Sequence, residues 1–264
     1  RLIAQAEDMA EQGVKELILV AQETTVYGRD LYGKKSLHIL LKKLCEIRGI
    51  RWIRILYCYP EEIYDELIQT MKEEPKVCNY LDLPIQHASD RILKRMGRRT
   101  SQADLRAIIG KLRQEIPDIC LRTTLISGFP GETEEEFETT VEFIKKIRFY
   151  ETHVFKYSRR KGTRADRMPD QIPEHIKTKR SEKLLELHRE NSKNYRNRLI
   201  GTTVEVLMEE AQEIDGICWQ VGHTREYVKV AVPQDESLTN QTVQVFVDGF
   251  RDQEMMQGKL RLNL

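Results

Sequence analysis

The sequence predicts an α/β fold: a partial (β/α) barrel of the TIM type, followed by a small all-β barrel. Between Lys15 and Tyr157, short apolar runs rich in β-branched residues alternate with amphipathic helical stretches. Beyond Gly201 the apolar residues recur at every second position instead. Strands that alternate with helices pair in parallel through crossovers, whereas short strands of period two form small β-barrels. Strand–helix units of roughly similar length fit a barrel or part of one better than a doubly wound sheet.

The individual elements follow from local patterns. Leu37, Leu40, Leu41 and Leu44 have the i, i+3, i+4, i+7 spacing of an amphipathic helix, and Pro60 stands at a favoured helix start. The predicted strands are Lys15–Val20, Trp52–Tyr57, Tyr80–Pro84, Cys120–Ile126 and Thr152–Tyr157. The predicted helices are one through Leu2, Ala6, Met9 and Ala10, then Leu37–Ile47, Glu61–Met71, Asp90–Met96, Gln102–Ile116 and Thr133–Ile147.

Three segments divide the chain. Residues 1–172 hold the alternating units, and residues 173–200 are predicted to be a linking helix, long and charged, over Glu174–Leu199. Residues 201–264 contain the period-two runs TVEVLM, WQVGH, YVKVAV and TVQVFV, broken by Gly, Asp and Pro. Short strands separated by such turn residues predict the small β-barrel.

Composition narrows the class of protein. The chain has 264 residues, of which 40% are hydrophobic and 32% charged, and this balance is typical of a globular protein. No apolar run approaches the roughly 18 residues that a membrane span needs. The five cysteines are scattered, without a CxxC spacing, which predicts reduced thiols, a cytoplasmic protein and no metal site within this chain. The chain opens with Arg1 in mid-pattern, so we expect it to be a fragment.

Charge is distributed unevenly. The loop from Lys156 to Arg167 holds six basic residues and one acidic residue, a balance of +5. From Gly201 to Leu264 there are five Lys and Arg against eleven Asp and Glu, a balance of −6. The two regions therefore predict different partners.

The stretch ISGFPGET, from Ile126 to Thr133, joins a predicted strand to a predicted helix. It is either a structural turn with a capping box, Thr133 and Glu136, or a ligand loop. Glu134, Glu135 and Glu136 argue against a phosphate, because they place anions at the positive end of the helix. Gly128 and Gly131 would let a neutral or cationic ligand approach the backbone.

Other polar residues follow the predicted strands, where barrel enzymes place functional groups. Gln86 is the better candidate for a ligand contact, and His87 is more typical of a hydrogen-bonded scaffold residue. Val154–Arg164 is either a last strand followed by a solvated basic loop or an edge for a flat heteroaromatic ligand with a basic rim.

These motifs resemble the radical S-adenosylmethionine methylthiotransferases. The resemblance runs from about Arg1 to Asn197, and it rests on AQETTVYGRDL, ILYCYPEE, YLDLPIQHASDRILKRMGRR, RTTLISGFPGETEEEF and VFKYSRRKGTRAD. YCYP and LDLPIQHAS are most similar to the branch that modifies an aspartate of the small-subunit ribosomal protein S-twelve. The tail after Gly201 resembles the TRAM barrel of the family.

The resemblance implies a radical S-adenosylmethionine barrel whose strand ends hold that cofactor. It implies two [4Fe–4S] clusters in the complete enzyme, with ligands outside this chain: the CxxxCxxC loop would precede the first helix here, together with the first strand. The chain alone is therefore expected to be inactive and to contain no catalytic residue. The implied cofactor-binding residues are Gln22, Glu23, Gln86, Arg122, Ser127, Gly128, Glu132, Val154, Phe155 and Tyr157.

The implied reaction starts with a 5′-deoxyadenosyl radical that takes hydrogen from a β-carbon, which then receives a methylthio group. The favoured partner is ribosomal protein S-twelve, free or on the ribosome, with no membrane and only secondary nucleic-acid contact. Glu209, Glu210 and Glu213 on the acidic barrel and Arg159 and Arg160 on the basic loop are the expected substrate contacts. Methylthiolation of adenosine in transfer RNA and a cluster-free binding module are the alternatives.

Overall fold

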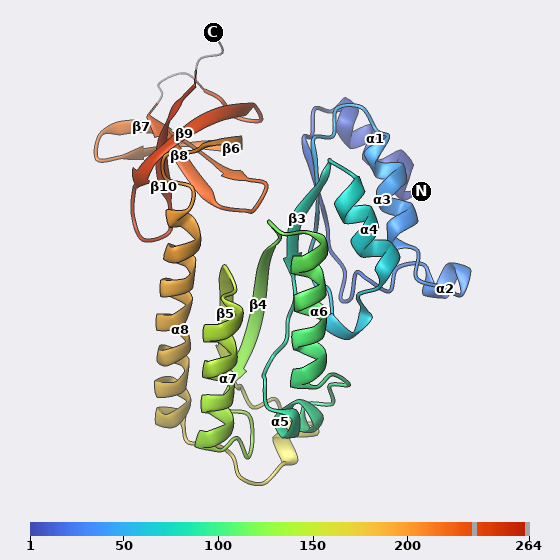
Figure 1. Ribbon diagram of the computed structural model, residues 1–264, viewed down its shortest axis with the longest axis vertical. Coiled ribbons are helices and arrows are strands. Elements are labelled where there is room, and N and C mark those ends of the chain that lie inside the picture. Colours follow the sequence, from blue (N-terminus) through green and yellow to red (C-terminus); the bar gives the residue numbers. More distant parts are fainter. Residues whose placement is uncertain (234–236, 262–264) are drawn as a thin grey trace.

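The computed structural model describes residues 1–233 and 237–261, and it shows two β-rich bodies joined by one long helix (Figure 1). A parallel sheet with helices on one face forms the larger body. The long helix α8 (Glu174–Asn197) runs beside the last strand of this sheet and leads into a small β-barrel at the other end. Asp235 and Glu236, two of the eleven acidic residues counted after Gly201, and Leu264 lie outside the described residues.

The five predicted strands of the sheet are confirmed. They lie in chain order β1-β2-β3-β4-β5, and each pairs in parallel with the next. Their bounds are β1 (Glu16–Leu19), β2 (Trp52–Ile55), β3 (Val77–Asp82), β4 (Cys120–Ser127) and β5 (Glu151–Lys156). An all-parallel sheet in sequential order is what right-handed crossovers give in a barrel, so the sheet is part of a TIM-type barrel.

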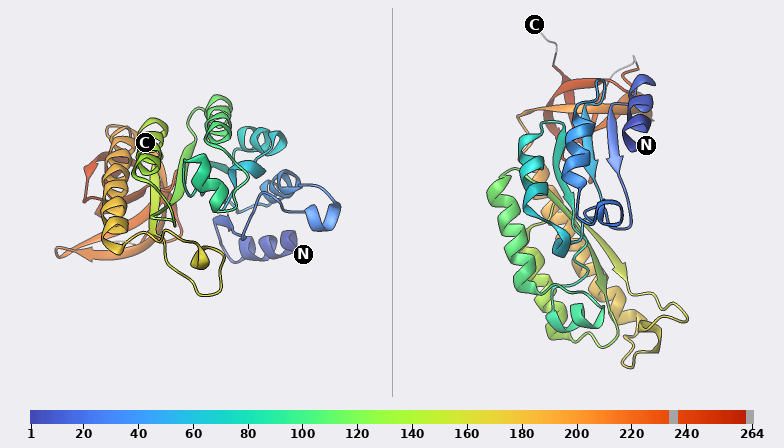
Figure 2. Two further views of the ribbon diagram at one scale, coloured as in Figure 1. Left: turned by 90° about the horizontal axis from the view of Figure 1, so that it is seen from below. Right: turned by 90° about the vertical axis from the view of Figure 1, so that its right-hand side faces the viewer.

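The helices form an arc over the outer face of the sheet (Figure 2). Their bounds are α1 (Leu2–Glu11), α2 (Arg29–Tyr32), α3 (Leu37–Cys45), α4 (Asp65–Glu73), α5 (Asp90–Arg95), α6 (Gln102–Glu115) and α7 (Glu134–Ile147), with short 3₁₀ turns η1 (Pro60–Glu62) and η2 (Ala165–Arg167). The predicted capping box of α7 is confirmed, since the Thr133 hydroxyl accepts the Glu136 N–H while the Glu136 carboxylate accepts the Thr133 N–H.

One prediction about these helices is wrong, and one short helix was not predicted. Pro60 does not start α4, because Ile63 and Tyr64 are extended and separate the 3₁₀ turn η1 from a helix that begins only at Asp65. The short helix α2 was not predicted; its four residues lie between Gly28 and Gly33, both in the left-handed conformation. Four residues are too few to show a periodic pattern.

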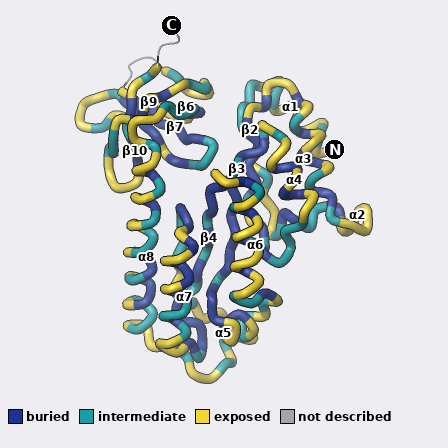
Figure 3. Tube along the Cα trace, in the orientation of Figure 1, coloured by how far each residue is buried: buried dark blue, intermediate teal, exposed yellow. Residues whose placement is uncertain are grey.

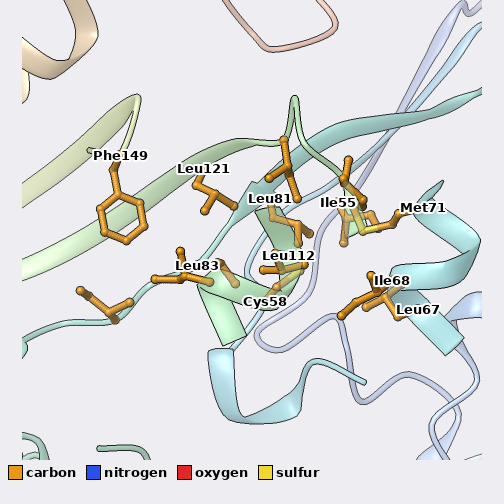
Figure 4. Close-up of a cluster of buried hydrophobic side chains, with 14 of the residues drawn as sticks. Ile55, Cys58, Leu67, Ile68, Met71, Leu81, Leu83, Leu112, Leu121 and Phe149 are labelled. Atoms are coloured by element: carbon orange, nitrogen blue, oxygen red, sulfur yellow. The ribbon is translucent and has the colours of Figure 1, made fainter. Parts of the chain in front are cut away.

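The two faces of the sheet pack against different partners. On the outer face, the side chains of Ile55, Leu81 and Leu121 meet those of the helices, including Leu67 and Met71 of α4 (Figure 4). On the inner face, β2, β3 and β4 contribute Trp52, Cys78, Tyr80 and Cys120 to a second cluster shared with the small barrel. Figure 3 shows that much of β3 and β4 is buried, whereas exposed positions are frequent on the helices.

The small barrel is closed, with strand order β10-β8-β7-β6-β9. Its strands are β6 (Thr203–Ile214), β7 (Ile217–Thr224), β8 (Lys229–Pro233), β9 (Thr242–Phe250) and β10 (Met256–Leu260). The first four agree with the period-two runs, and β10, with Gly258 near its middle, was not predicted. Val206, Val230 and Val245 fill its interior, all with no measurable exposure.

Polar side chains also join the two bodies. Arg54 of β2, whose side chain is fully buried, donates from Nε to Glu16 of β1 at 2.7 Å and from Nη1 to the Arg225 carbonyl oxygen at 2.6 Å. His223 of β7 contacts the second oxygen of Glu16 at 2.6 Å and Glu209 of β6 at 3.0 Å. We call Glu16, Arg54, Glu209 and His223 the junction cluster.

Within the described ranges, no helix combines the length and the apolar character that crossing a membrane requires.

Candidate functional site

A cavity of about 420 Å³ lies on the inner face of the sheet, near the carboxyl ends of the strands. All five strands or the loops that follow them contribute to it. Its lining is Ala21, Gln22, Tyr57, Tyr59, Pro84, Gln86, Arg122, Thr124, His153 and Phe155. Because carboxyl strand ends meet at one edge of a parallel sheet, residues distant in the sequence converge here. The predicted site residues Gln22, Gln86, Arg122 and Phe155 are thus brought together.

Two lining residues have an unusual backbone. Tyr57 and Gln86 adopt φ values of 56° and 68°, in the left-handed region that favours glycine. The Tyr57 N–H donates to Oδ2 of Asp82 at 3.3 Å, and the Gln86 N–H donates to the Thr124 carbonyl oxygen at 2.9 Å. Such conformations cost of order 1–3 kcal/mol and gather at functional sites. Tyr57 comes two residues after β2 and Gln86 four residues after β3, and both line the cavity.

Charged groups converge on one wall of the cavity. The Arg122 guanidinium lies 3.9 Å from Asp82 and 3.8 Å from Glu151, and its Nη2 contacts the His153 ring at 2.8 Å. Burial raises the pKa of Asp82, which Arg122 offsets in part. Within the described part of the chain, Nε of Arg122 and Oδ1 of Asp82 have no hydrogen-bond partner although both are buried. Unpaired buried polar atoms are rare in folded proteins, and here they flank a cavity.

Glu23 does not line the cavity but fixes its rim. Its carboxylate accepts hydrogen bonds from the Thr25 N–H at 3.0 Å and from the Tyr59 N–H at 2.9 Å, and from the Thr25 hydroxyl. Burial raises the pKa of this carboxyl, and the hydrogen bonds oppose the shift. Glu23 therefore ties the loop after β1 to the loop after β2, which carries two aromatic lining residues.

Three predicted residues of the β4–α7 turn lie behind the cavity wall. Ser127 is fully buried on the helix side of β4. Gly128 has φ 72°, and a Cβ there would lie 2.2 Å from the aliphatic stem of Lys177. The Glu132 carboxylate accepts from the Gly128 N–H at 2.5 Å and from Arg180 of α8 at 2.8 Å, and it contacts His87 at 2.9 Å. The bare backbone at Gly128 thus makes room for a lysine of α8.

The last strand presents alternate residues to the two sides. Phe155 lies in the cavity lining and is 55% exposed, whereas Val154 packs against the helix-side core. Tyr157, beyond the strand, packs its ring on Phe129 with centroids 5.3 Å apart. Of the predicted edge, only Phe155 lines the cavity with its side chain.

The predicted substrate contacts lie at opposite ends of the molecule. Arg159 and Arg160 belong to the loop after β5, at the bottom of Figure 1, and Arg159 pairs with Asp166 at 2.8 Å. Glu210 and Glu213 are exposed on β6, in the small barrel at the top. Glu209 is turned toward His223 in the junction cluster. The structure therefore does not bring the acidic and basic sets together.

Six lining residues were not among the predicted cofactor-binding residues: Ala21, Tyr57, Tyr59, Pro84, Thr124 and His153. Two of them had a signal. Thr124 stands two positions after Arg122 and His153 two positions before Phe155, so strand periodicity would have placed each beside its predicted neighbour. Tyr57 has a left-handed backbone without glycine, for which the local sequence has no signal.

The cavity combines a cationic group, which lies near Asp82 and Glu151, with amide side chains and exposed aromatic rings at the mouth of a parallel half-barrel. Residues 1–144 match the family model described as "Radical SAM superfamily". The chain belongs to the radical SAM superfamily. Among the described residues of this radical SAM chain, no three His, Cys, Asp or Glu side chains are placed to hold a metal ion, and the five cysteines are free.

Several curated relatives are similar over most of the chain. It is 56% identical over 217 residues to the "Ribosomal protein uS12 methylthiotransferase RimO" of Lachnoclostridium phytofermentans, covering 82% of the chain and 49% of that protein. It is 52% identical over 210 residues to the protein of the same name from Desulfitobacterium hafniense, covering 80% and 47%. This radical SAM chain therefore spans about half the length of the curated relatives it matches.

Solved structures are more distant. The radical S-adenosylmethionine methyltransferase TsrM from Kitasatospora setae aligns with a TM-score of 0.46 at 16% identity, covering 58% of this chain and 29% of TsrM. The Elp3 protein of Methanocaldococcus infernus aligns with a TM-score of 0.47 at 12% identity, covering 98% and 78%.

Proposed function

We propose that this chain supplies the cofactor-binding half-barrel and the C-terminal barrel of an enzyme that methylthiolates ribosomal protein uS12 at the β-carbon of an aspartate. The observation that carries the proposal is the identity of 56% over 82% of the chain with a relative of that name. The complete enzyme would hold two [4Fe–4S] clusters, on ligands outside this chain. The five cysteines of this chain are free thiols, which fits a cytoplasmic enzyme.

The cavity fits S-adenosylmethionine in chemistry. This cofactor carries an α-carboxylate, an ammonium group, a sulfonium and a flat adenine. Arg122 would hold the carboxylate and Asp82 the ammonium, since each has a buried atom without a partner in the described chain. Phe155 and Tyr57 offer exposed rings for the adenine. When bound, the cofactor and the clusters supply the radical and sulfur chemistry.

The remaining predicted residues would act from behind the wall. Glu23 would hold together the two loops at the rim of the cavity. Gln22 and Gln86, which line the cavity, would donate hydrogen bonds to the cofactor. Glu132 would hold the Gly128 turn against α8, and Ser127, Val154 and Tyr157 would fix the last two strands. In this arrangement the chain binds and orients the cofactor and excludes water, which radical chemistry at an unactivated carbon requires.

The acidic barrel supports a protein substrate. Glu210 and Glu213 are exposed and have no cationic partner among the described residues. An acidic surface attracts a basic ribosomal protein and repels nucleic acid at long range. Transfer RNA is the second candidate, because Arg160, Lys161 and Arg164 on the loop after β5 also lack carboxylate partners in the described chain.

The test is the double variant Glu210→Lys and Glu213→Lys in the full-length enzyme. Glu209 is left unchanged, because a lysine there would face buried His223. We expect binding to uS12 to weaken roughly tenfold at low salt, with the loss shrinking as salt rises. Mass spectrometry should detect one methylthio group on an aspartate of uS12.

The matched control is Glu182→Lys and Glu186→Lys. It makes the same change in charge on an exposed face of α8, away from the small barrel, and should leave uS12 affinity nearly unchanged. Methylthio transfer to adenosine in transfer RNA, with none to uS12, would replace the proposal with the second candidate.

A further inference from the structure

A second groove, of about 320 Å³, lies at the end of the sheet opposite the cofactor cavity. It is bounded by the carboxyl ends of three helices, α6, α7 and α8, which approach one another beside the root of the small barrel (Figure 1). Arg113 comes from α6, Lys146 and Arg148 from the end of α7, and Arg198 from the end of α8. We call these four residues the basic groove.

None of the four cations of the basic groove forms an ion pair with a carboxylate in the described chain, although such pairs are frequent elsewhere on the surface. One carboxylate, Asp118, lines the groove, and the Asn79 side-chain amide donates to both of its oxygens at 3.0 Å. The cations are thus free to meet an anion from outside.

Cations at helix carboxyl ends have an ordinary explanation, because they complement the helix dipole. Each helix end carries roughly half a negative elementary charge, so three ends offset about 1.5 positive charges. Four cations less the Asp118 charge leave +3, so a surplus of about +1.5 remains after the helix ends are counted. The dipoles alone do not account for the groove.

Arg148 gives an independent reason. It is the C-cap of α7 and has φ 55°, in the left-handed conformation for which glycine is strongly preferred. An arginine there destabilises the fold by about 1 kcal/mol relative to glycine, so the position sacrifices stability for a positive side chain. Such a trade is common where a residue contacts a ligand.

The groove is also partly preorganised. Arg113 donates from Nη2 to the Ile147 carbonyl oxygen at 2.5 Å, which fixes its guanidinium at the end of α7. Burial, and then the charge of Arg148, lower the pKa of Arg113, as expected where cations crowd together without anions. The Arg198 guanidinium lies over the Tyr195 ring, 5.1 Å from its centroid, and the centroid of the Tyr150 ring lies 4.7 Å from that of Tyr195.

We propose that the basic groove binds the phosphodiester backbone of RNA. Arginine forks match phosphate oxygens, and several cations along an open groove neutralise successive phosphates. The groove adjoins an acidic barrel, so the two surfaces together fit a particle in which a basic protein lies in RNA. This last argument rests on the proposed function, whereas the groove itself does not.

The experiment measures binding of a fluorescein-labelled 12-nucleotide single-stranded RNA to the full-length protein by fluorescence anisotropy. The variant Lys146→Glu with Arg148→Glu should weaken binding roughly tenfold or more at 100 mM salt. Loss of two phosphate contacts should also reduce the slope of log affinity against log salt by about 1.4, or 0.7 for each contact. The matched control, Lys34→Glu with Arg48→Glu, makes the same charge change on exposed residues far from the groove and should alter affinity less than threefold.

A single substitution separates binding from folding. Arg148→Gly relieves the left-handed strain, so thermal stability should rise or stay constant while RNA affinity falls roughly threefold to tenfold. A structural role for Arg148 at the end of α7 would lower both together.

Three results would overturn the proposal. Equal losses in the groove variant and its control would show attraction by net charge alone. Unchanged binding in the groove variant, with a loss in Arg160→Glu with Lys161→Glu, would place RNA on the loop after β5. Equal competition by poly-glutamate at the same charge would show a site for acidic protein. Since binding and not methylthio transfer is read, failure here leaves the proposed function standing, and failure of uS12 modification leaves the groove standing.

Discussion

At the scale of single residues, the proposed cofactor site centres on Arg122 and the unpaired atoms beside it. Nε of Arg122 and Oδ1 of Asp82 lie 3.9 Å apart, too far for a hydrogen bond, and both are buried. A ligand with one anionic and one cationic group could pair with both atoms, the anionic group with Arg122 and the cationic group with Asp82. Two unpaired atoms of opposite charge, side by side, are therefore what a preformed site for a zwitterion needs.

We expect Arg122→Met in the full-length enzyme to reduce the affinity for S-adenosylmethionine roughly tenfold to a hundredfold. The reason is that a charge-assisted hydrogen bond contributes about 1.5–3 kcal/mol. Arg122→Lys keeps the charge but loses the planar fork, so the affinity of this variant for S-adenosylmethionine should be intermediate between those of the parent protein and Arg122→Met. Calorimetric titration measures the affinity, and a thermal melt of each variant reports on the fold. Unchanged affinity in a folded Arg122→Met variant would exclude Arg122 from the site.

Four of the residues that the family resemblance implied line one cavity. Gln22, Gln86, Arg122 and Phe155 lie together because carboxyl strand ends meet at one mouth, and their roles toward a cofactor stay predictions. Tyr57 was missed because its left-handed conformation is imposed by the Asp82 contact, from another strand, and nothing in its own neighbourhood indicates it.

At the scale of elements, the turn between β4 and α7 is held by the next helix along the chain. Gly128 leaves room for the Lys177 stem, and Glu132 pairs with Arg180, so two residues of α8 fix one turn. The sequence predicted the strand, the capping box and the need for bare backbone. It could not show that a lysine 49 positions later occupies the space, because α8 carries no local signal of its packing partner.

Gly128→Ala is therefore expected to destabilise the fold by about 1–3 kcal/mol. The alanine would hold a left-handed φ and its Cβ would overlap the Lys177 stem. Denaturant unfolding measures the loss. Adding Lys177→Ala should recover the steric part and leave the conformational part of about 1 kcal/mol. Full recovery would mean that the backbone strain is negligible, and no recovery would mean that Lys177 is not the obstacle.

At the scale of the whole molecule, the junction cluster fixes the small barrel to the inner face of the sheet. Glu16 and Arg54 come from the first two strands, whereas Glu209 and His223 come from the barrel, about 200 residues later in the chain. The periodicity of the apolar residues and the composition predicted both the parallel sheet and the small barrel. Pairing between distant polar residues, however, depends on how these two bodies pack against each other. No pattern in the sequence could reveal it.

This cluster makes the joint between the bodies depend on pH. Burial opposes the charge of His223, but contacts with Glu16 and Glu209 outweigh it and raise the pKa of His223 above the usual 6.5. Because the folded protein binds the His223 proton more tightly than the unfolded chain does, protonated His223 stabilises the fold. This stabilisation is fully present below about pH 6.5 and is lost as the pH rises through the pKa of His223 in the folded state. The pKa of Glu209 is lowered by His223 from its usual 4.5, so its contribution is lost only under acid conditions. The junction is therefore strongest between about pH 4.5 and pH 6.5.

We expect the melting temperature to fall between pH 6 and pH 9 by a few degrees more in the parent protein than in His223→Gln, which cannot be protonated. Because that variant could itself loosen the barrel, Glu209→Gln provides a second test. It removes one carboxylate that holds the proton, so the loss of stability should begin at lower pH while the fold is retained. Nuclear magnetic resonance of the His223 ring gives its pKa directly. A His223 pKa at or below 6.5, or identical pH profiles in the three proteins, would mean that the barrel is held by Trp52, Tyr80 and their apolar neighbours alone.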